Sequence, residues 1–175
     1  MTLAILVAIS LMWISVAILF LGKGEAKGTG AITSFVGLVV VLGAFIQTAV
    51  FKDAFTGGLL FAHGLLYCTV GYALLAGLED LRSVGNVSLA VALISAVYMM
   101  IFFTGGTAAD GSILVGKSNY FALACAGYTI LTLEVWLNAY GKLKAETLAW
   151  SLIIWVPIGL WVPAFMLMAK GALPF

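Results

Sequence analysis

The sequence predicts an all-α integral membrane protein built as a bundle of six transmembrane helices. Of the 175 residues, 64% are hydrophobic and only 9% are charged, whereas a soluble domain carries about 25% charged residues. The apolar residues also gather into six long stretches, and almost every charge lies between them. Each stretch provides the roughly 20 residues that a helix needs to cross about 30 Å of hydrocarbon.

The expected spans follow one another with short connections. They are residues 2–21, 31–51, 57–76, 86–104, 118–139 and 148–169. The first stretch lacks the basic start of a signal peptide and is too long for its apolar region, so it is expected to be helix one. Because the spans leave little chain for anything else, we expect a single domain over residues 1–175.

Basic residues in the connections predict the orientation. Five of them follow the first, third and fifth spans: Lys23, Lys27, Arg82, Lys142 and Lys144. The other end has three: Lys52, Lys117 and Lys170. The excess of basic residues in cytoplasmic loops then places both termini on the extracytoplasmic side. We expect a multi-pass protein of the bacterial cytoplasmic (inner) membrane, surrounded by lipid, and the net charge of +1 argues against a nucleic-acid partner.

Motifs that indicate catalysis or metal binding are missing from the sequence. Cys68 and Cys125 both fall inside spans and are expected to be small packing residues rather than a disulfide. With one His and no CxxC motif, a metal site is not expected. The Gly-rich segments 22–30 and 104–117 fit no phosphate-binding pattern and are interpreted as flexible turns. We therefore expect neither an enzyme nor a cofactor.

Glycines recur on two of the spans and predict close helix packing. They are Gly57, Gly64 and Gly71 in the third span and Gly30, Gly37 and Gly43 in the second. In lipid, helices associate through close van der Waals contact, so small residues mark their interfaces. In the sixth span, Pro157 and Pro163 are expected to kink the helix and to free backbone carbonyl groups.

Two ionisable residues lie inside the spans, where each is a functional hypothesis because burying a charge in lipid is costly. Glu134 is interpreted as a proton or cation site, as a side chain that reaches the inner interface, or as a contact between subunits. His63 is interpreted either as a titrating gate or as a neutral side chain bonded to Tyr67, four residues on.

The fifth span carries a stripe of four residues on one helical face. Phe121, Cys125, Tyr128 and Thr132 are spaced by four, three and four residues, so they align, and Glu134 points nearly the opposite way. Aromatic faces mixed with small, weakly polar groups are typical of a path for a small neutral polar solute. Ordinary bundle core is the alternative.

Four segments, in this order, carry a family resemblance. They are Leu21-Gly22-Lys23, Phe35-Val36-Gly37, Gly58-Leu59-Leu60-Phe61 followed by Leu66-Tyr67, and Trp161-Val162-Pro163-Ala164-Phe165. Together they resemble the AmiS/UreI family of urea and short-chain amide channels. The resemblance implies a homo-oligomer, typically a hexamer, with one pore in each protomer, passive solute movement and no cofactor. It also implies pore-lining roles for Leu6, Ile9, Trp13, Phe61, Leu65 and Trp155, which would turn His63 away from the pore.

The sequence departs from the family in ways that bear on the solute. The family's tryptophan ladder in helix five is replaced by the stripe above, which has no Trp until Trp136. Trp155 stands where urea channels often have Glu, and Thr33 and Ser34 stand where many members have Asn. Trp13 and Trp155 are hypothesised to restore the lost aromatic volume. The outer loops contain no His, so the acid gating of some members is not expected.

The function expected from these observations is a passive, selective channel for small neutral polar solutes, namely urea, acetamide or other short-chain amides. One alternative is a proton-coupled transporter that uses Glu134 and His63. Another is a membrane subunit or sensor that transports nothing and binds a partner through its Gly-rich faces.

Overall fold

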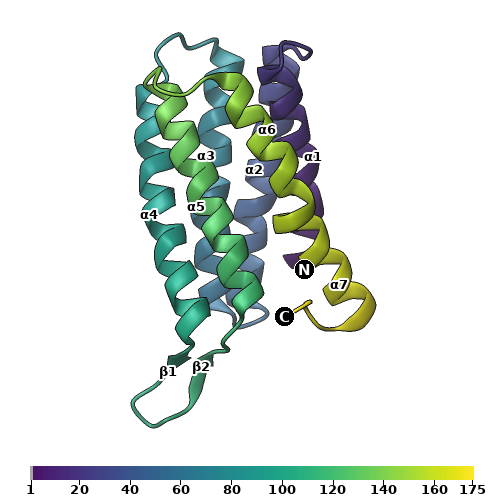
Figure 1. The fold of residues 1–175 in the computed structure, drawn as a ribbon, viewed down its shortest axis with the longest axis vertical. Coiled ribbons are helices and arrows are strands. Elements are labelled where there is room, and N and C mark those ends of the chain that lie inside the picture. The colour runs from purple at the N-terminus through teal and green to yellow at the C-terminus, as the bar shows by residue number, and fades with distance from the viewer. Residues whose placement is uncertain (1) are drawn as a thin grey trace.

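The computed structural model describes residues 2–175 and contains six long helices that run side by side (Figure 1). The first five are α1 (Thr2–Phe20), α2 (Ala26–Ala49), α3 (Ala54–Ala76), α4 (Arg82–Thr104) and α5 (Asn119–Ala139). The last span consists of α6 (Ala145–Trp155), the π-helix η1 (Val156–Trp161) and α7 (Val162–Lys170). All six are long and apolar enough to cross a membrane, which confirms the predicted fold class.

Both chain termini lie at one end of the bundle, which we call the terminal end (Figure 1). The turn between α2 and α3 and the connection between α4 and α5 lie at the same end. The connections at residues 21–25, 77–81 and 140–144 lie at the opposite end. A path along the bundle would therefore run from one of these ends to the other.

Helices α2, α3, α4 and α6 begin three to five residues earlier than the apolar stretches predicted. In α2 and α3, side chains cap the backbone N–H groups of the added first turn. The Glu25 side chain accepts hydrogen bonds from the N–H groups of Lys27 and Gly28, and Asp53 accepts one from Thr56. Such N-caps stabilise a helix start that lies outside the apolar stretch.

The connection between α4 and α5 contains a short hairpin where a flexible turn was predicted. Strands β1 (Gly106–Thr107) and β2 (Ile113–Val115) pair antiparallel. Gly105 and Gly111 have φ values of 78° and 84°, a region that only glycine adopts readily. These two glycines allow the chain to leave α4 and to turn at the hairpin tip.

The predicted glycine faces bring α2 and α3 into close contact. A Cβ atom added to Gly37 would lie 2.7 Å from the backbone nitrogen of Cys68, and one added to Gly64 would lie 3.0 Å from that of Val41. Gly30 and Gly71, each seven residues from Gly37 and Gly64 along its helix, approach each other in the same way. The packing prediction is therefore confirmed for these glycines, and it makes α2–α3 a tightly fixed pair.

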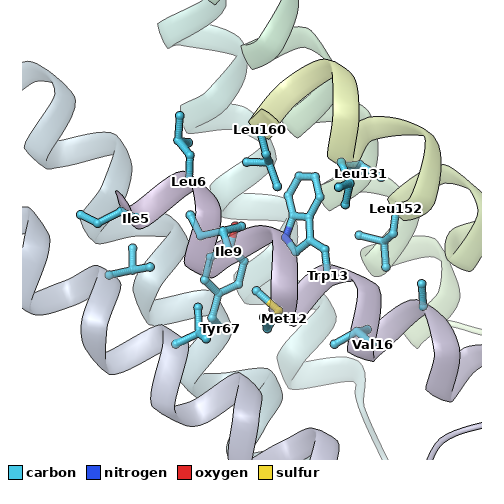
Figure 2. Packing of buried hydrophobic residues seen from close by; sticks show 14 of the residues in the cluster. Ile5, Leu6, Ile9, Met12, Trp13, Val16, Tyr67, Leu131, Leu152 and Leu160 are labelled. Carbon is cyan, nitrogen blue, oxygen red and sulfur yellow. The ribbon is translucent and has the colours of Figure 1, made fainter. Parts of the chain in front are cut away.

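Helix α1 supplies the centre of the buried core. Its residues Ile5, Ile9, Met12 and Val16 recur at intervals of three or four, Trp13 follows Ile9 by four residues, and all five are buried. Figure 2 shows them pointing into the bundle beside Tyr67 of α3 and the leucines of α5, α6 and η1. One face of α1 therefore forms a wall of the bundle interior.

The last span is broken at its two prolines, as the sequence predicted. Pro163 has no N–H group, so it cannot bond to the carbonyl of Gly159 four residues before it. The N–H of Val162 bonds instead to Pro157, five residues back. The free carbonyls are taken by tyrosines of α5: the Tyr120 hydroxyl donates to Ile158 O and the Tyr128 hydroxyl to Gly159 O, both at 2.6 Å.

Candidate functional site

Two cavities lie inside the bundle. The first, the wide cavity, has a volume of about 410 Å³ and is bordered by Leu3, Asp53 and Leu167 at the terminal end. The second, the narrow cavity, has a volume of about 80 Å³ and extends past Trp13 to Phe20, toward the opposite end. Together they follow the long axis of the bundle.

Three side chains line both cavities and therefore lie between them: His63, Tyr67 and Tyr128. We call these three residues the aromatic constriction. The ring centre of His63 lies 5.9 Å from that of Tyr67 and 5.5 Å from that of Tyr128. Trp13 meets Tyr128 edge to face at 6.0 Å on the narrow side. A solute that passed between the cavities would have to pass these rings.

Hydrogen bonds to neighbouring residues fix His63 in the constriction. Its Nε2 atom lies 3.0 Å from Ser95 Oγ on α4, and its Nδ1 atom lies 3.4 Å from the Tyr67 hydroxyl. If Tyr67 donates to Nδ1, the N–H at Nε2 donates to Ser95, which is the pattern of a neutral imidazole. The predicted contact with Tyr67 is thus confirmed, and Ser95 is an additional partner.

Tyr128 is held by the break in the last span. Its hydroxyl donates to the Gly159 carbonyl that Pro163 leaves free. The ring is therefore fixed across the interior of the bundle, between Trp13 and His63. In this way a proline in the last span sets the position of a side chain on α5.

The structure places seven of the ten predicted pore residues on a cavity wall. Leu6, Ile9, Phe121, Cys125 and Tyr128 line the wide cavity, and Trp13, Tyr128 and Thr132 line the narrow one. They all come from α1 and α5. The helical-wheel stripe on the fifth span therefore faces the interior as predicted.

On α3 the structure contradicts the predicted orientation. Phe61 and Leu65 line neither cavity, and their side chains are 36% and 46% exposed on the outside of the bundle. Phe61 packs there against Phe45 of α2, with ring centres 5.5 Å apart. Residues two apart on a helix point about 200° apart, so the same rotation turns His63 and Tyr67 inward.

Trp155 also lies away from both cavities. Its ring occupies the space beside Gly127, where a Cβ atom would collide with it. It therefore fills the seam between α5 and α6, behind Tyr128, instead of lining a path. Of the two tryptophans expected to restore aromatic volume, only Trp13 reaches a cavity.

Glu134 faces the same seam, seven residues after Gly127. Ser151 of α6 donates a hydrogen bond to its Oε1 atom at 2.9 Å. Its Oε2 atom is buried and has no hydrogen-bond partner among the described residues. Glu134 lines neither cavity, so the structure does not bring it together with His63.

Sequence reasoning missed a polar group at the wide cavity, formed by Gln47, Asp53 and Thr56. Asp53 accepts hydrogen bonds from the Thr56 N–H and from Gln47 Nε2, both at 2.9 Å. Partial burial acts to raise the pKa of Asp53, but these hydrogen bonds outweigh it and hold the pKa below 3.8. The Asp-x-x-Thr pattern before an apolar stretch was the available signal.

Comparison with known structures shows where else this fold occurs. The fold is similar to a crystal structure of the urea channel from Helicobacter pylori, with a TM-score of 0.79, 20% identity, and coverage of 98% of this chain and 99% of that one. It is also similar to a cryo-EM structure of the H. pylori urea channel in a closed state, with a TM-score of 0.77, 19% identity, and coverage of 99% and 100%. At these identities the likeness shows a shared fold.

The sequence itself shows the family. No curated protein sequence matches the chain significantly. The family described as AmiS/UreI family transporter matches residues 1–171. The six long apolar helices of the chain make it a multi-pass membrane protein. The chain therefore belongs to the AmiS/UreI family of transporters.

Proposed function

We propose that this protein is a passive, selective channel for small neutral polar solutes, namely urea, acetamide and other short-chain amides. One observation carries the proposal: two cavities along the bundle axis meet at a constriction of three aromatic rings without a formal charge. A path of this kind selects by size, planarity and the lack of charge.

The constriction suits a flat, uncharged solute. Among the described residues, no Asp, Glu, Lys or Arg lines the narrow cavity, and the hydrogen bonds of His63 and Tyr128 go to the protein. An ion would lose its hydration there without a partner, which costs far more than desolvating an amide. A planar amide keeps contact with ring faces, and its weak binding allows it to leave.

The position of Glu134 favours passive movement over proton coupling. A coupled transporter needs its proton site to contact the solute path or a helix that moves with it. Glu134 lies in the α5–α6 seam, bonded to Ser151, and His63 lies in the constriction, bonded to Ser95. The two groups proposed for coupling are thus on different interfaces.

The glycine faces give little support to a partner-binding subunit. Gly37, Gly64 and Gly71 are buried between α2 and α3 of the same chain. A partner could not use them without separating that pair. The residues that line the cavities include no arrangement typical of an active site, so we do not propose an enzyme.

Orientation and assembly form part of the same proposal. The distribution of basic residues supports extracytoplasmic termini, which would open the wide cavity toward the outside of the cytoplasmic membrane. Large apolar side chains cover the outside of the bundle, among them Phe35, Phe45 and Leu93. We propose that they contact lipid and neighbouring copies in a homo-oligomer, with a hexamer as the family resemblance implies.

Stopped-flow light scattering on proteoliposomes tests the channel. Urea, acetamide and glycerol gradients are applied in turn, with protein-free liposomes as the control. We expect faster equilibration of urea or acetamide than in the control, and no acceleration of glycerol. Rates equal to those of protein-free liposomes for all three solutes would exclude a passive amide channel.

A further inference from the structure

A carboxylate lies at the outer edge of the wide cavity and is held rigidly. The Asp53 N–H donates to Gln47 O at 3.1 Å, Gln47 Nε2 donates to Asp53 Oδ2 and the Thr56 N–H donates to Oδ1, both at 2.9 Å. Lys52, just before it, has a φ of 57°, which non-glycine residues rarely adopt. This turn fixes the carboxylate on the cavity wall.

The charge of Asp53 has no ion-pair partner within the described chain. The one salt bridge found there joins Arg82 to Asp80 at the opposite end of the bundle. The start of α3 compensates the charge in part, because a helix N-terminus carries roughly half a positive charge. Each carboxylate oxygen accepts one hydrogen bond from the protein and has about one further lone pair to offer. A ligand with N–H groups could use both.

Aromatic rings line the same cavity. Phe102 of α4 and Phe121 of α5 line it and stand 5.2 Å apart, centre to centre. Phe55, which is not on the cavity wall, packs 5.2 Å from Phe102. Phe51, next to the turn, also lines the cavity. A carboxylate beside aromatic faces is a setting in which planar organic cations bind, through charge-assisted hydrogen bonds and cation–π contact.

We propose that the wide cavity binds small planar N–H cations of the amidinium and guanidinium class and that these cations block the channel. They resemble acetamide and urea in shape, so they fit the same space of about 410 Å³. Asp53 attracts them, while the aromatic constriction stops them because it offers no compensating charge. The blocking effect rests on the proposed channel function, whereas binding to Asp53 does not.

The first test measures block. Acetamide permeability is recorded in proteoliposomes with acetamidinium chloride, against sodium chloride of equal ionic strength, and expressed as a ratio within each variant. We expect acetamidinium to block the wild type and Asp53→Asn to raise the half-blocking concentration by at least about tenfold, as for loss of one charged hydrogen-bond acceptor. Asn also caps helices well, so α3 should still form.

Asp110→Asn is the matched control. It removes the same charge at the same end of the molecule, where Asp110 is bonded to Ser112 in the hairpin, and it should leave the block unchanged. Equal block in wild type and Asp53→Asn would overturn the proposal, as would equal weakening in both variants, because the effect would then come from general charge.

The second test measures binding without transport. Isothermal titration of acetamidinium into the detergent-solubilised protein should show binding to the wild type and to Asp110→Asn, but at least about tenfold weaker binding to Asp53→Asn. If liposomes show no amide flux but this pattern holds, the channel function fails and the cation site stands. If flux is present without block or binding, the cation site fails and the channel stands.

Discussion

The helix pairs α2–α3 and α5–α6 are held together by opposite means. In α2–α3, glycines bring backbone against backbone, and Gly37 and Gly64 leave no room for a side chain. In α5–α6, side chains fill the seam: Trp155 covers Gly127, and Ser151 bonds to Glu134. A larger side chain in the α2–α3 interface would separate the two helices, whereas the side-chain contacts between α5 and α6 can be changed one at a time.

The difference matters because each pair presents different residues to the proposed solute path. The rigid pair carries His63 and Tyr67 on α3, and it also carries Asp53 at its turn. The seam supports Tyr128 through the Gly159 carbonyl. We therefore expect changes in α2–α3 to act on folding, and changes in α5–α6 to act first on stability and then on the width of the constriction.

The largest effect is expected from Gly64→Leu. The first added carbon already lies 2.8 Å from Val41 Cγ2 and 3.0 Å from its backbone nitrogen, so the helices must separate. Overpacking of this kind costs about 1–3 kcal/mol or more, and the loss of the whole interface should prevent recovery of folded protein. Size-exclusion chromatography and thermal unfolding in detergent provide the measurement.

Gly116→Ala is the matched control for Gly64→Leu, because nothing lies within 4 Å of the added carbon. It should behave as the wild type. A Gly64→Leu variant that elutes and melts like the wild type would show that α2 and α3 are not packed through their backbones.

The next effect separates the two tryptophans. Trp155→Ala leaves a void in the α5–α6 seam and should lower stability by up to about 3 kcal/mol, the lower end of the range for buried Trp→Ala, because Trp155 is only partly buried. We expect little gain for larger amides. Trp13→Ala also removes core volume, but it widens the narrow cavity that Trp13 lines. It should therefore raise butyramide permeability relative to acetamide. If Trp155→Ala, and not Trp13→Ala, raised butyramide permeability relative to acetamide, the solute path would run along the α5–α6 seam.

The cavity-lining face of α5 could be predicted from the sequence, because spacing alone aligns Phe121, Cys125, Tyr128 and Thr132. The cavity-lining residues of α1 were expected only from the family resemblance. The orientation of α3 could not be predicted. Its apolar residues surround the helix, so periodicity does not choose between Phe61 with Leu65 and His63 with Tyr67. The choice is made by partners on other helices: Ser95 bonds to His63, and the α2–α3 glycines fix the rotation of the helix.

In the sixth span, too, some features could be predicted from the sequence and others could not. The prolines predicted a break and freed carbonyls, because the missing N–H group is a property of the residue itself. That the Tyr120 and Tyr128 hydroxyls would take those carbonyls depends on how α5 and η1 meet. The positions of Trp155 and Asp53 likewise follow from tertiary contacts and a turn, which single-helix patterns do not contain.

A smaller effect is expected from Glu134→Gln. Gln keeps an oxygen that accepts the Ser151 hydrogen bond, so acetamide permeability should stay within about twofold of the wild type, a difference below 0.5 kcal/mol. Permeability should also be nearly constant between about pH 7 and 5, the usual His range. Uptake against an acetamide gradient that Glu134→Gln abolishes would favour proton coupling through the seam.

The smallest effect concerns the turn that joins the rigid pair. Partial burial acts to raise the pKa of Asp53, but its hydrogen bonds from Thr56 and Gln47 hold the pKa below 3.8. A lowered folded-state pKa means that the ionised cap stabilises the fold above that value and that this contribution is lost as the pH falls below it. The wild type should thus lose part of its thermal stability below about pH 4.

Asp53→Asn tests this dependence, because the amide caps the helix without titrating. Its thermal midpoint should fall less than that of the wild type between pH 5 and 3, by a few degrees at most, and other carboxyl groups titrate equally in both proteins. Parallel midpoints would mean that the α2–α3 turn holds without the charge of Asp53. The glycine contacts alone would then account for the rigidity of that pair, and Asp53 would remain free to serve a ligand in the wide cavity.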